Sequence, residues 1–371
     1  MTTSEAPTLG NRRLNKSVVL KRRPAGAPTP EDFDVVVREL EPVVESHVEV
    51  ENLAVSLDAG FRHWMDEGSG DHVLPAMELG QPVMGLVLSR VIESRHQSFE
   101  VGDVIVSRLA WQEYSQFNGD LHHIKIRVDE TLGLDLGVHL GILGDTGLSA
   151  YFGLFDHGRP TAGETVLVSA AAGAVGNVVG QLARIHGCRV IGIVGDDDKA
   201  RFLVDSLGFD GCINRHRDVA AQLKELCPNG VDVYFDNVGG PILEVVLDHI
   251  ASGARIVLCG AVATYNSPEK VPGPSNLFSL VTKNATMTGF LTGQRHDQYD
   301  EARSRIIAWM QAGQLKNLEH RLHGIENVGI AFCDMFAGRN LGKTLVQLKP
   351  TAPRTKLNRV ESAQVSARLT R

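Results

Sequence analysis

A regular alternation of strand-like and helix-like segments between residues 165 and 311 limits what this chain can fold into more than any other feature. Short, β-branched runs predict strands at 165–169, 189–194, 212–214, 231–235, 254–259 and 285–290. The stretches between and after them predict helices at 175–186, 198–207, 217–226, 242–250 and 298–311. Strands and helices that alternate in this way form a parallel sheet with helices on both faces. The sequence therefore predicts a doubly wound α/β domain.

The segment after the first of these strands has the glycine spacing of a dinucleotide-binding loop. Gly173 and Gly176 keep the G-x-G-x-x-G spacing, with Ala171 in place of the first glycine. Gly173 would let the backbone approach a pyrophosphate, and Gly176 would let the helix pack closely against the strand. The residues predicted to contact the dinucleotide here are Ala172, Gly173, Ala174, Val175 and Gly176.

Two observations disagree about which dinucleotide is bound. Asp196 lies 20 residues after the last glycine of the loop, where an NAD site usually has a carboxylate. Gly195 separates this acidic run from the strand, however, so we expect the aspartates to cap the next helix. Lys199 and Arg215 would then be available to neutralise a 2′-phosphate. The sequence therefore favours NADP(H) over NAD(H).

The first third of the chain has a different pattern, with short β runs interrupted by Gly, Pro and Asp. The predicted strands include 33–40, 48–57, 83–92 and 101–109, which suggests a small barrel-like β domain. A helix is expected at 136–155, where the pattern changes. Residues 315–348 return to a β pattern, and their last strand could rejoin the first domain. Two domains suit a chain of 371 residues.

Charge is distributed unevenly over the chain. Residues 1–24 carry six Lys/Arg and one Glu, and residues 351–371 carry five Lys/Arg and one Glu, although the net charge is −7. Basic ends on an acidic body suggest solvated tails rather than a nucleic-acid surface. The uncharged stretch 165–183 contains too many glycine and polar residues for a membrane span. We expect no nucleic-acid partner and no membrane.

All five cysteines lie in the second half of the chain, beginning at Cys188, and none forms a C-x-x-C pair. This excludes a disulfide-based fold and a zinc–cysteine module. No signal peptide precedes the first domain, so we expect a cytoplasmic protein. No metal site is predicted.

Several motifs follow one another in fixed order between residues 11 and 348. They include Arg23-Pro24-x-Gly26-x-Pro28, Leu57-Asp58, Trp111-Gln112-Glu113-Tyr114, Asp236-Asn237-Val238-Gly239-Gly240 and Asn340-Leu341-Gly342-Lys343-Thr344. In these motifs the chain resembles the zinc-independent branch of the medium-chain dehydrogenase/reductase superfamily. It is most similar to the group of leukotriene/prostaglandin reductases, plant double-bond reductases and bacterial curcumin reductases.

The resemblance implies a GroES-like β-barrel catalytic domain and a Rossmann domain. The expected boundaries are a basic tail at 1–16, the catalytic domain at 17–135, the NADP-binding domain at 136–313, a return to the catalytic domain at 314–350, and a basic tail at 351–371. It also implies NADPH-dependent reduction of the C=C bond of an α,β-unsaturated ketone or aldehyde, and a homodimer. The missing cysteines match a family branch without catalytic zinc.

The resemblance also assigns site residues outside the glycine loop. Lys199 and Arg215 would meet the 2′-phosphate, and four further residues would contact the cofactor: Asn237, Cys259, Phe290 and Asn340. Tyr265 would lie beside both nicotinamide and substrate and act as the catalytic proton donor. From the residues alone, a loop tyrosine is more often a packing or surface residue, so its role depends on the resemblance.

The substrate side departs from the family pattern. Ala59-Gly60-Phe61-Arg62 stands where the family usually has Pro-Tyr-Met-Arg, so a tyrosine is replaced by Gly60. We expect Gly60, Phe61 and Tyr265 to line a reshaped substrate pocket. Two alternatives remain at this point: an NADPH quinone reductase on the same scaffold, and a catalytically silent NADPH-binding interaction or sensor protein.

Overall fold

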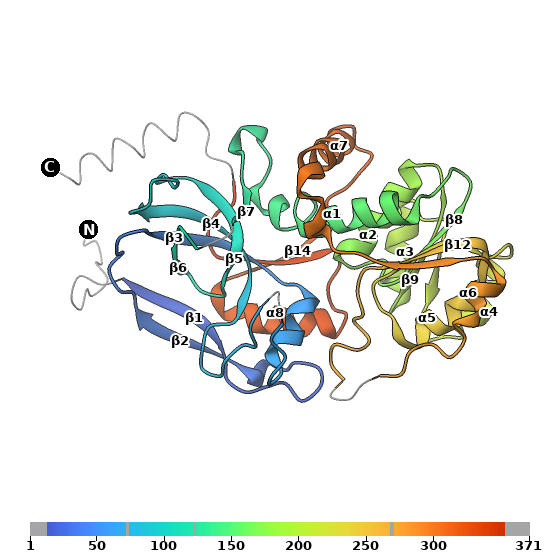
Figure 1. Ribbon diagram of the computed structural model, residues 1–371, viewed down its shortest axis with the longest axis horizontal. Helices are drawn as coiled ribbons and strands as arrows, with labels where there is room; N and C mark the ends of the chain where they lie inside the picture. Colours follow the sequence, from blue (N-terminus) through green and yellow to red (C-terminus); the bar gives the residue numbers. More distant parts are fainter. Residues whose placement is uncertain (1–12, 72–73, 122–123, 268–270, 353–371) are drawn as a thin grey trace.

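The computed structural model describes residues 13–71, 74–121, 124–267 and 271–352. A β-rich N-terminal part occupies one end of the molecule, and a parallel sheet with its helices occupies the other (Figure 1). The predicted fold class is confirmed. Most of the two expected tails lies outside the described residues. Strand β1 already begins at Leu14, and the buried Thr351 donates a hydrogen bond of 2.8 Å to Asp135, so structure extends into both segments.

The parallel sheet has the strand order β10-β9-β8-β11-β12-β13. The strands are β8 (Thr165–Val168), β9 (Arg189–Val194), β10 (Gly211–Asn214), β11 (Val231–Asp236), β12 (Ile250–Leu258) and β13 (Thr286–Gly289). The helices are α2 (Ala174–Ile185), α3 (Asp197–Leu207), α4 (Val219–Leu226), α5 (Gly240–Leu247), α6 (Phe278–Thr282) and α7 (Tyr299–Gln311). All predicted elements are present, with ends displaced by four residues at most, and only α6 was not expected.

The strand order explains where ligands can bind. Strand β8 lies between β9 and β11, so the chain leaves the sheet centre on one side and returns on the other. The loops after β8 and β11 therefore separate at the carboxyl edge of the sheet. In open α/β sheets this edge is where a crevice forms and binds ligands.

The N-terminal part contains a seven-stranded sheet and a two-stranded one. The larger sheet is built from β3 (His47–Ser56), β4 (Met84–Ser94), β5 (Val104–Ala110), β6 (Tyr114–Asn118), β7 (Ile124–Arg127), β14 (Glu319–His323) and β15 (Lys343–Gln347). The smaller sheet pairs β1 (Leu14–Leu20) with β2 (Phe33–Glu39). Strand β15 pairs antiparallel with β3, so the end of the chain does return to the first β domain.

One correction concerns residues 315–348, where the sequence suggested only β structure. A helix, α8 (Val328–Phe336), lies between β14 and β15. Its β-branched and aromatic residues favour a strand locally, but Val328, Ala331 and Phe332 repeat with helical spacing and are all buried. Phe332 packs edge-on against Trp111, with ring centroids 5.3 Å apart. Packing against the core of the first domain therefore overrides local propensity.

A second correction concerns the helix expected at 136–155. The structure has a 3-10 turn, η4 (Leu136–Leu140), then α1 (Asp145–Phe152) and a π-helical turn, η5 (Gly153–Gly158). Glycines cause the interruption: a Cβ on Gly147 would lie 1.7 Å from the carbonyl oxygen of Ile142. The remaining short helical turns are η1 (Pro30–Asp32), η2 (Ala59–Met65), η3 (Glu130–Leu132), η6 (Thr292–Gln298) and η7 (Ile325–Asn327).

Candidate functional site

The glycine loop connects β8 to α2 as the sequence predicted. A Cβ on Gly176 would lie 2.4 Å from the carbonyl oxygen of Ala170, so only glycine permits this close approach of helix and loop. Gly173 is the residue before the first turn of α2, and a Cβ there would approach the same oxygen to 3.1 Å. The amide groups of the first turn of α2 are therefore presented at the carboxyl edge of the sheet, where an anion can accept their hydrogen bonds.

A buried carboxylate ties the loops after β8 and β11 together. Asp236 is fully buried and accepts hydrogen bonds from the Ser169 hydroxyl (2.8 Å) and from the amides of Val238 (2.9 Å) and Gly239 (3.0 Å). The side-chain amide of Asn237 donates to the carbonyl oxygen of Ser169 (2.8 Å). The sequence analysis placed Asn237 in the site but missed Ser169 and Asp236, whose role depends on the pairing of their two strands.

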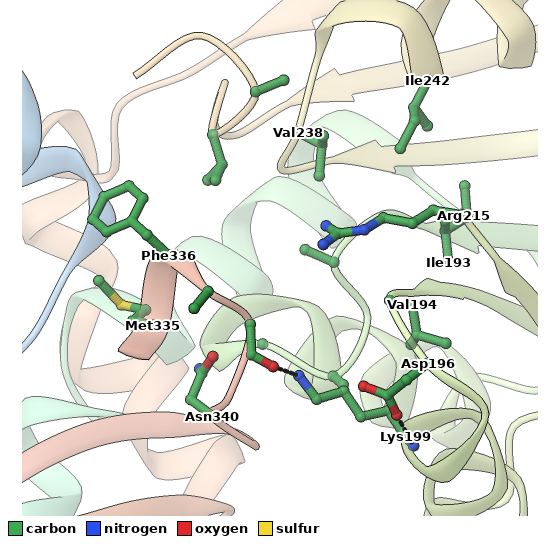
Figure 2. Close-up of a pocket in the computed structure, with 18 of the residues that line it drawn as sticks. Ile193, Val194, Asp196, Lys199, Arg215, Val238, Ile242, Met335, Phe336 and Asn340 are labelled. Carbon is green, nitrogen blue, oxygen red and sulfur yellow. Dashed lines mark hydrogen bonds between the residues drawn. The ribbon is translucent and has the colours of Figure 1, made fainter. Parts of the chain in front are cut away.

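A cavity of about 490 Å³, called here the basic cavity, lies along this edge. Lys199 comes from the first turn of α3, and Arg215 follows directly after β10. Figure 2 shows both cationic side chains together with Met335, Phe336 and Asn340 from the other domain. The wider lining includes Ala170, Ala172, Gly173, Ile193, Val194, Gly195, Asp196, Val238, Gly239, Pro241 and Ile242.

The acidic run at 196–198 behaves as a helix start, as expected. The Asp196 carboxylate caps α3 by accepting a hydrogen bond of 2.7 Å from the amide of Lys199. Asp197 pairs with Arg217, and Asp198 pairs with Arg201. These carboxylates are therefore occupied by the cap and by cations.

The ammonium group of Lys199 lies at the seam between the two domains. It donates a hydrogen bond to the carbonyl oxygen of Gly338, in the segment between α8 and β15 (Figure 2). Burial lowers the pKa of Lys199; Asp196 opposes this shift, and the positive charge of Arg215 adds to it. Two neighbouring cations that partly destabilise each other favour an anionic ligand between them.

A second cavity of about 420 Å³, called here the junction cavity, lies between the domains. Its walls come from the segment 57–60, from α1, from the glycine loop, from the loop after β12 and from the segment 335–344. The lining residues are Leu57, Asp58, Ala59, Gly60, Thr146, Ser149, Ala170, Gly173, Ala174, Val175, Gly176, Asn237, Cys259, Gly260, Val262, Tyr265, Met335, Phe336, Asn340, Gly342 and Thr344.

Tyr265 brings a neutral hydroxyl group to the junction cavity. Its oxygen accepts a hydrogen bond of 3.1 Å from the amide of Ala261. Burial raises the pKa of Tyr265, so the phenol keeps its proton at neutral pH. Burial likewise raises the pKa of Cys259 to about 12, so this thiol is a protonated wall residue rather than a nucleophile. Tyr265 can therefore donate a hydrogen bond within the cavity.

Most of the residues predicted for the site line one of the two cavities. The basic cavity includes Ala172, Gly173, Lys199, Arg215 and Asn340, and the junction cavity includes Gly60, Gly173, Ala174, Val175, Gly176, Asn237, Cys259, Tyr265 and Asn340. Phe61 and Phe290 are not part of either lining. Phe61 packs in the N-terminal core against Trp64, and Phe290 stacks on His157 with ring centroids 5.1 Å apart. Their proposed ligand contacts stay predictions.

The sequence analysis did not identify several wall residues. Met335 and Phe336 were missed because α8 was expected to be β structure. Asp58 lines the junction cavity and pairs with the buried Lys343, which also donates to the carbonyl oxygen of Leu57 (3.1 Å). Asp58 and Lys343 are 285 residues apart in the chain, so no local pattern could have paired them.

Two searches of the described residues concern metals and membranes. No group of three or more His, Cys, Asp or Glu side chains is arranged to hold a metal ion in that part of the chain. Among the helices that the structure describes, none has the length and apolar character needed to cross a bilayer. The expected cytoplasmic location stays a prediction.

Comparison with known proteins finds matches along nearly the whole chain. Residues 16–124 match the family model described as the N-terminal domain of oxidoreductase, and residues 174–308 match the model described as zinc-binding dehydrogenase. The NADPH-dependent curcumin reductase of Escherichia coli is 35% identical over 91% of this chain and 98% of its own length. The NADP-dependent 2-alkenal reductase of Nicotiana tabacum is 36% identical over 90% of this chain and 97% of its own.

A solved structure agrees with these relatives. The crystal structure of CurA from Vibrio vulnificus in complex with NADPH is 35% identical, covers 90% of this chain and 99% of its own, and has a TM-score of 0.82. Sequence identity above one third over nine tenths of the chain, together with the two family models, is decisive. The chain belongs to the medium-chain dehydrogenase/reductase superfamily, in the zinc-independent group that contains the curcumin, 2-alkenal and prostaglandin reductases.

Proposed function

We propose that this protein uses NADPH to reduce the C=C bond of α,β-unsaturated ketones and aldehydes. Its family consists of NADP-dependent oxidoreductases, and its relatives include enzymes named for the reduction of 2-alkenals and curcumin. The observation that carries the proposal is the hydroxyl group of Tyr265 in the junction cavity, opposite the glycine loop and next to the open space at Gly60.

The described residues fit NADPH at both of its ends. The close approach at Gly176 and the first turn of α2 suit a pyrophosphate, and the two cations of the basic cavity suit a 2′-phosphate. Asn340 lines both cavities, so it suits the middle of an extended dinucleotide. When bound, NADPH supplies a hydride.

The chain's own residues then handle the substrate's oxygen and proton. Reduction places a hydride on the β-carbon, and negative charge develops on the carbonyl oxygen. The Tyr265 hydroxyl stabilises that charge by donating a hydrogen bond, which is worth most in a cavity shielded from water. The α-carbon is afterwards protonated by Tyr265 or by water, which completes the saturated ketone or aldehyde. The raised pKa of Tyr265 suits a hydrogen-bond donor that stays neutral.

The test is oxidation of NADPH in the presence of unsaturated ketones and aldehydes, with quinones and NADH as comparisons. We expect turnover with enones and a preference for NADPH. Faster turnover of quinones at saturating NADPH would replace the proposal by a quinone reductase. Stoichiometric binding of NADPH without oxidation by any compound of the panel would indicate an interaction or sensor protein.

We also propose that two copies of the chain associate through the edge of the parallel sheet. Strand β13 is the outermost strand on that side, and exposed apolar side chains accompany it: Phe278 is 71% exposed, Val281 68% and Leu291 62%. A free strand edge with apolar neighbours favours pairing with an identical edge about a two-fold axis. Sedimentation equilibrium should give twice the mass of the chain, whereas the mass of a single chain would contradict the dimer.

A further inference from the structure

Gly60 lines the junction cavity, yet neither backbone conformation nor crowding requires a glycine there. It lies in η2, where its φ is not in the left-handed region, and a Cβ would meet no atom within 4 Å. Gly176 shows the opposite case, because a Cβ there would collide with the backbone. A side chain at position 60 would therefore be tolerated by the fold, and what the glycine provides is empty space at the cavity.

The surrounding chain keeps that space from closing. The residues on either side of Gly60 are anchored: Asp58 pairs with Lys343, and the buried Arg62 donates to the carbonyl oxygens of Pro24 (3.0 Å) and Gly26 (3.1 Å). The helical turn that carries Gly60 is thus tied to β15 on one side and to the segment before β2 on the other. The opening is consequently preformed, so a ligand entering it pays little reorganisation cost.

The walls around the opening suit an apolar ring. Met335 and Phe336 come from the end of α8, and Leu57 and Ala59 come from the segment that also carries Gly60. Thioether and aromatic side chains make favourable contacts with aromatic rings. Asp58 is the only charged residue among the described residues of this lining, and its partner is Lys343.

We propose that the space at Gly60 is a subsite for a ring-bearing substituent, so that the substrates of this protein are enones with an aryl group attached to the double bond. The inference rests on the proposed function, because it assigns the C=C bond to the same cavity as Tyr265. It adds which class of enone the cavity selects. A tyrosine-sized side chain at position 60 would occupy the volume that the aryl group needs.

The test compares benzylideneacetone, which carries a phenyl ring on the β-carbon, with methyl vinyl ketone, which carries none. Gly60→Phe should lower the ratio of kcat/KM for benzylideneacetone over methyl vinyl ketone by about tenfold or more, as expected when a pocket loses the room for a group of this size. Gly60→Ala is the matched control: it adds one methyl group and should lower the ratio far less. An unchanged ratio in Gly60→Phe would overturn the subsite.

A binding measurement separates failure of the subsite from failure of the proposed function. Calorimetry with benzylacetone, the saturated ketone, in the presence of NADP⁺ requires no turnover. We expect Gly60→Phe to bind it about tenfold more weakly than the wild type, with Gly60→Ala between them. Equal affinities for the wild type and Gly60→Phe would refute the subsite even if enones are reduced. Weaker binding by Gly60→Phe without any enone turnover would support the subsite and refute the reductase. Thermal unfolding of each variant confirms that it folds.

Discussion

The basic cavity and the junction cavity share the glycine loop and Asn340 but differ in how the chain builds them. The basic cavity is built mainly from loops that follow consecutive parallel strands, with Lys199 and Arg215 at its charged end. The junction cavity takes its walls from segments near residues 58, 147, 265 and 340, which lie in both domains. One cavity thus depends on a local repeat, whereas the other depends on how two domains meet.

Their electrostatics differ as well. The basic cavity has two cations, one of which has a pKa lowered by burial, and it suits a phosphate. The junction cavity has neutral hydroxyl groups on Thr146, Ser149, Tyr265 and Thr344. The difference indicates that recognition of the cofactor and chemistry on the substrate are carried by separate side chains. Substitutions in one cavity should therefore leave the property of the other measurable.

The largest effect is expected at Tyr265. Tyr265→Phe removes the hydroxyl group but keeps the ring, so kcat for enones should fall about 100-fold, as for loss of a proton donor or an oxyanion donor. The preference for NADPH over NADH should not change, because Tyr265 does not line the basic cavity. Steady-state kinetics with both cofactors measures the two quantities. Unchanged turnover of every accepted enone would remove Tyr265 from the mechanism.

A smaller effect is expected at the other cavity. Lys199→Ala should raise KM for NADPH about tenfold and leave KM for NADH almost unchanged, because a charge-assisted contact to phosphate is lost. Asp198→Ala offers a control on the same helix turn, since Asp198 is exposed and pairs only with Arg201 among the contacts described. A loss of affinity of equal size for both cofactors in Lys199→Ala would mean that the lysine does not read the 2′-phosphate.

The smallest effect concerns stability rather than either ligand. His139 lies in η4, next to the turn that leads to α1, and burial lowers its pKa to about 4, with Arg303 acting in the same direction. The unfolded chain, with a histidine pKa near 6.5, binds this proton more readily than the folded chain. Stability is therefore full above about pH 6.5 and is lost as the pH falls toward the folded-state pKa.

From about pH 7 to about pH 5.5 the wild type should lose about 1 kcal/mol through this group. Urea unfolding at both pH values measures it, with His139→Leu as the variant that cannot titrate. If the two proteins lose stability equally on acidification, His139 is not the group responsible.

The contrast between the cavities also explains how much could be predicted from the sequence. The alternation of strands and helices, the glycine loop and the capping aspartates are short-range patterns, so the parallel sheet and the basic cavity followed from them. Helix α8 was missed because its helical spacing only makes sense against the core around Trp111. The pair of Asp58 with Lys343 and the open space at Gly60 depend on contacts between distant segments. Family resemblance, not local pattern, brought Tyr265 into the site.

Transfer of deuterium from NADPH labelled at its transferable hydrogen tests the central claim most directly. With benzylideneacetone as substrate, the account predicts saturated benzylacetone that carries one deuterium on the carbon that bore the phenyl ring, as NMR can show. Deuterium on the carbonyl carbon, with the C=C bond intact and an alcohol as product, would contradict the assignment of this protein as a reductase of conjugated double bonds.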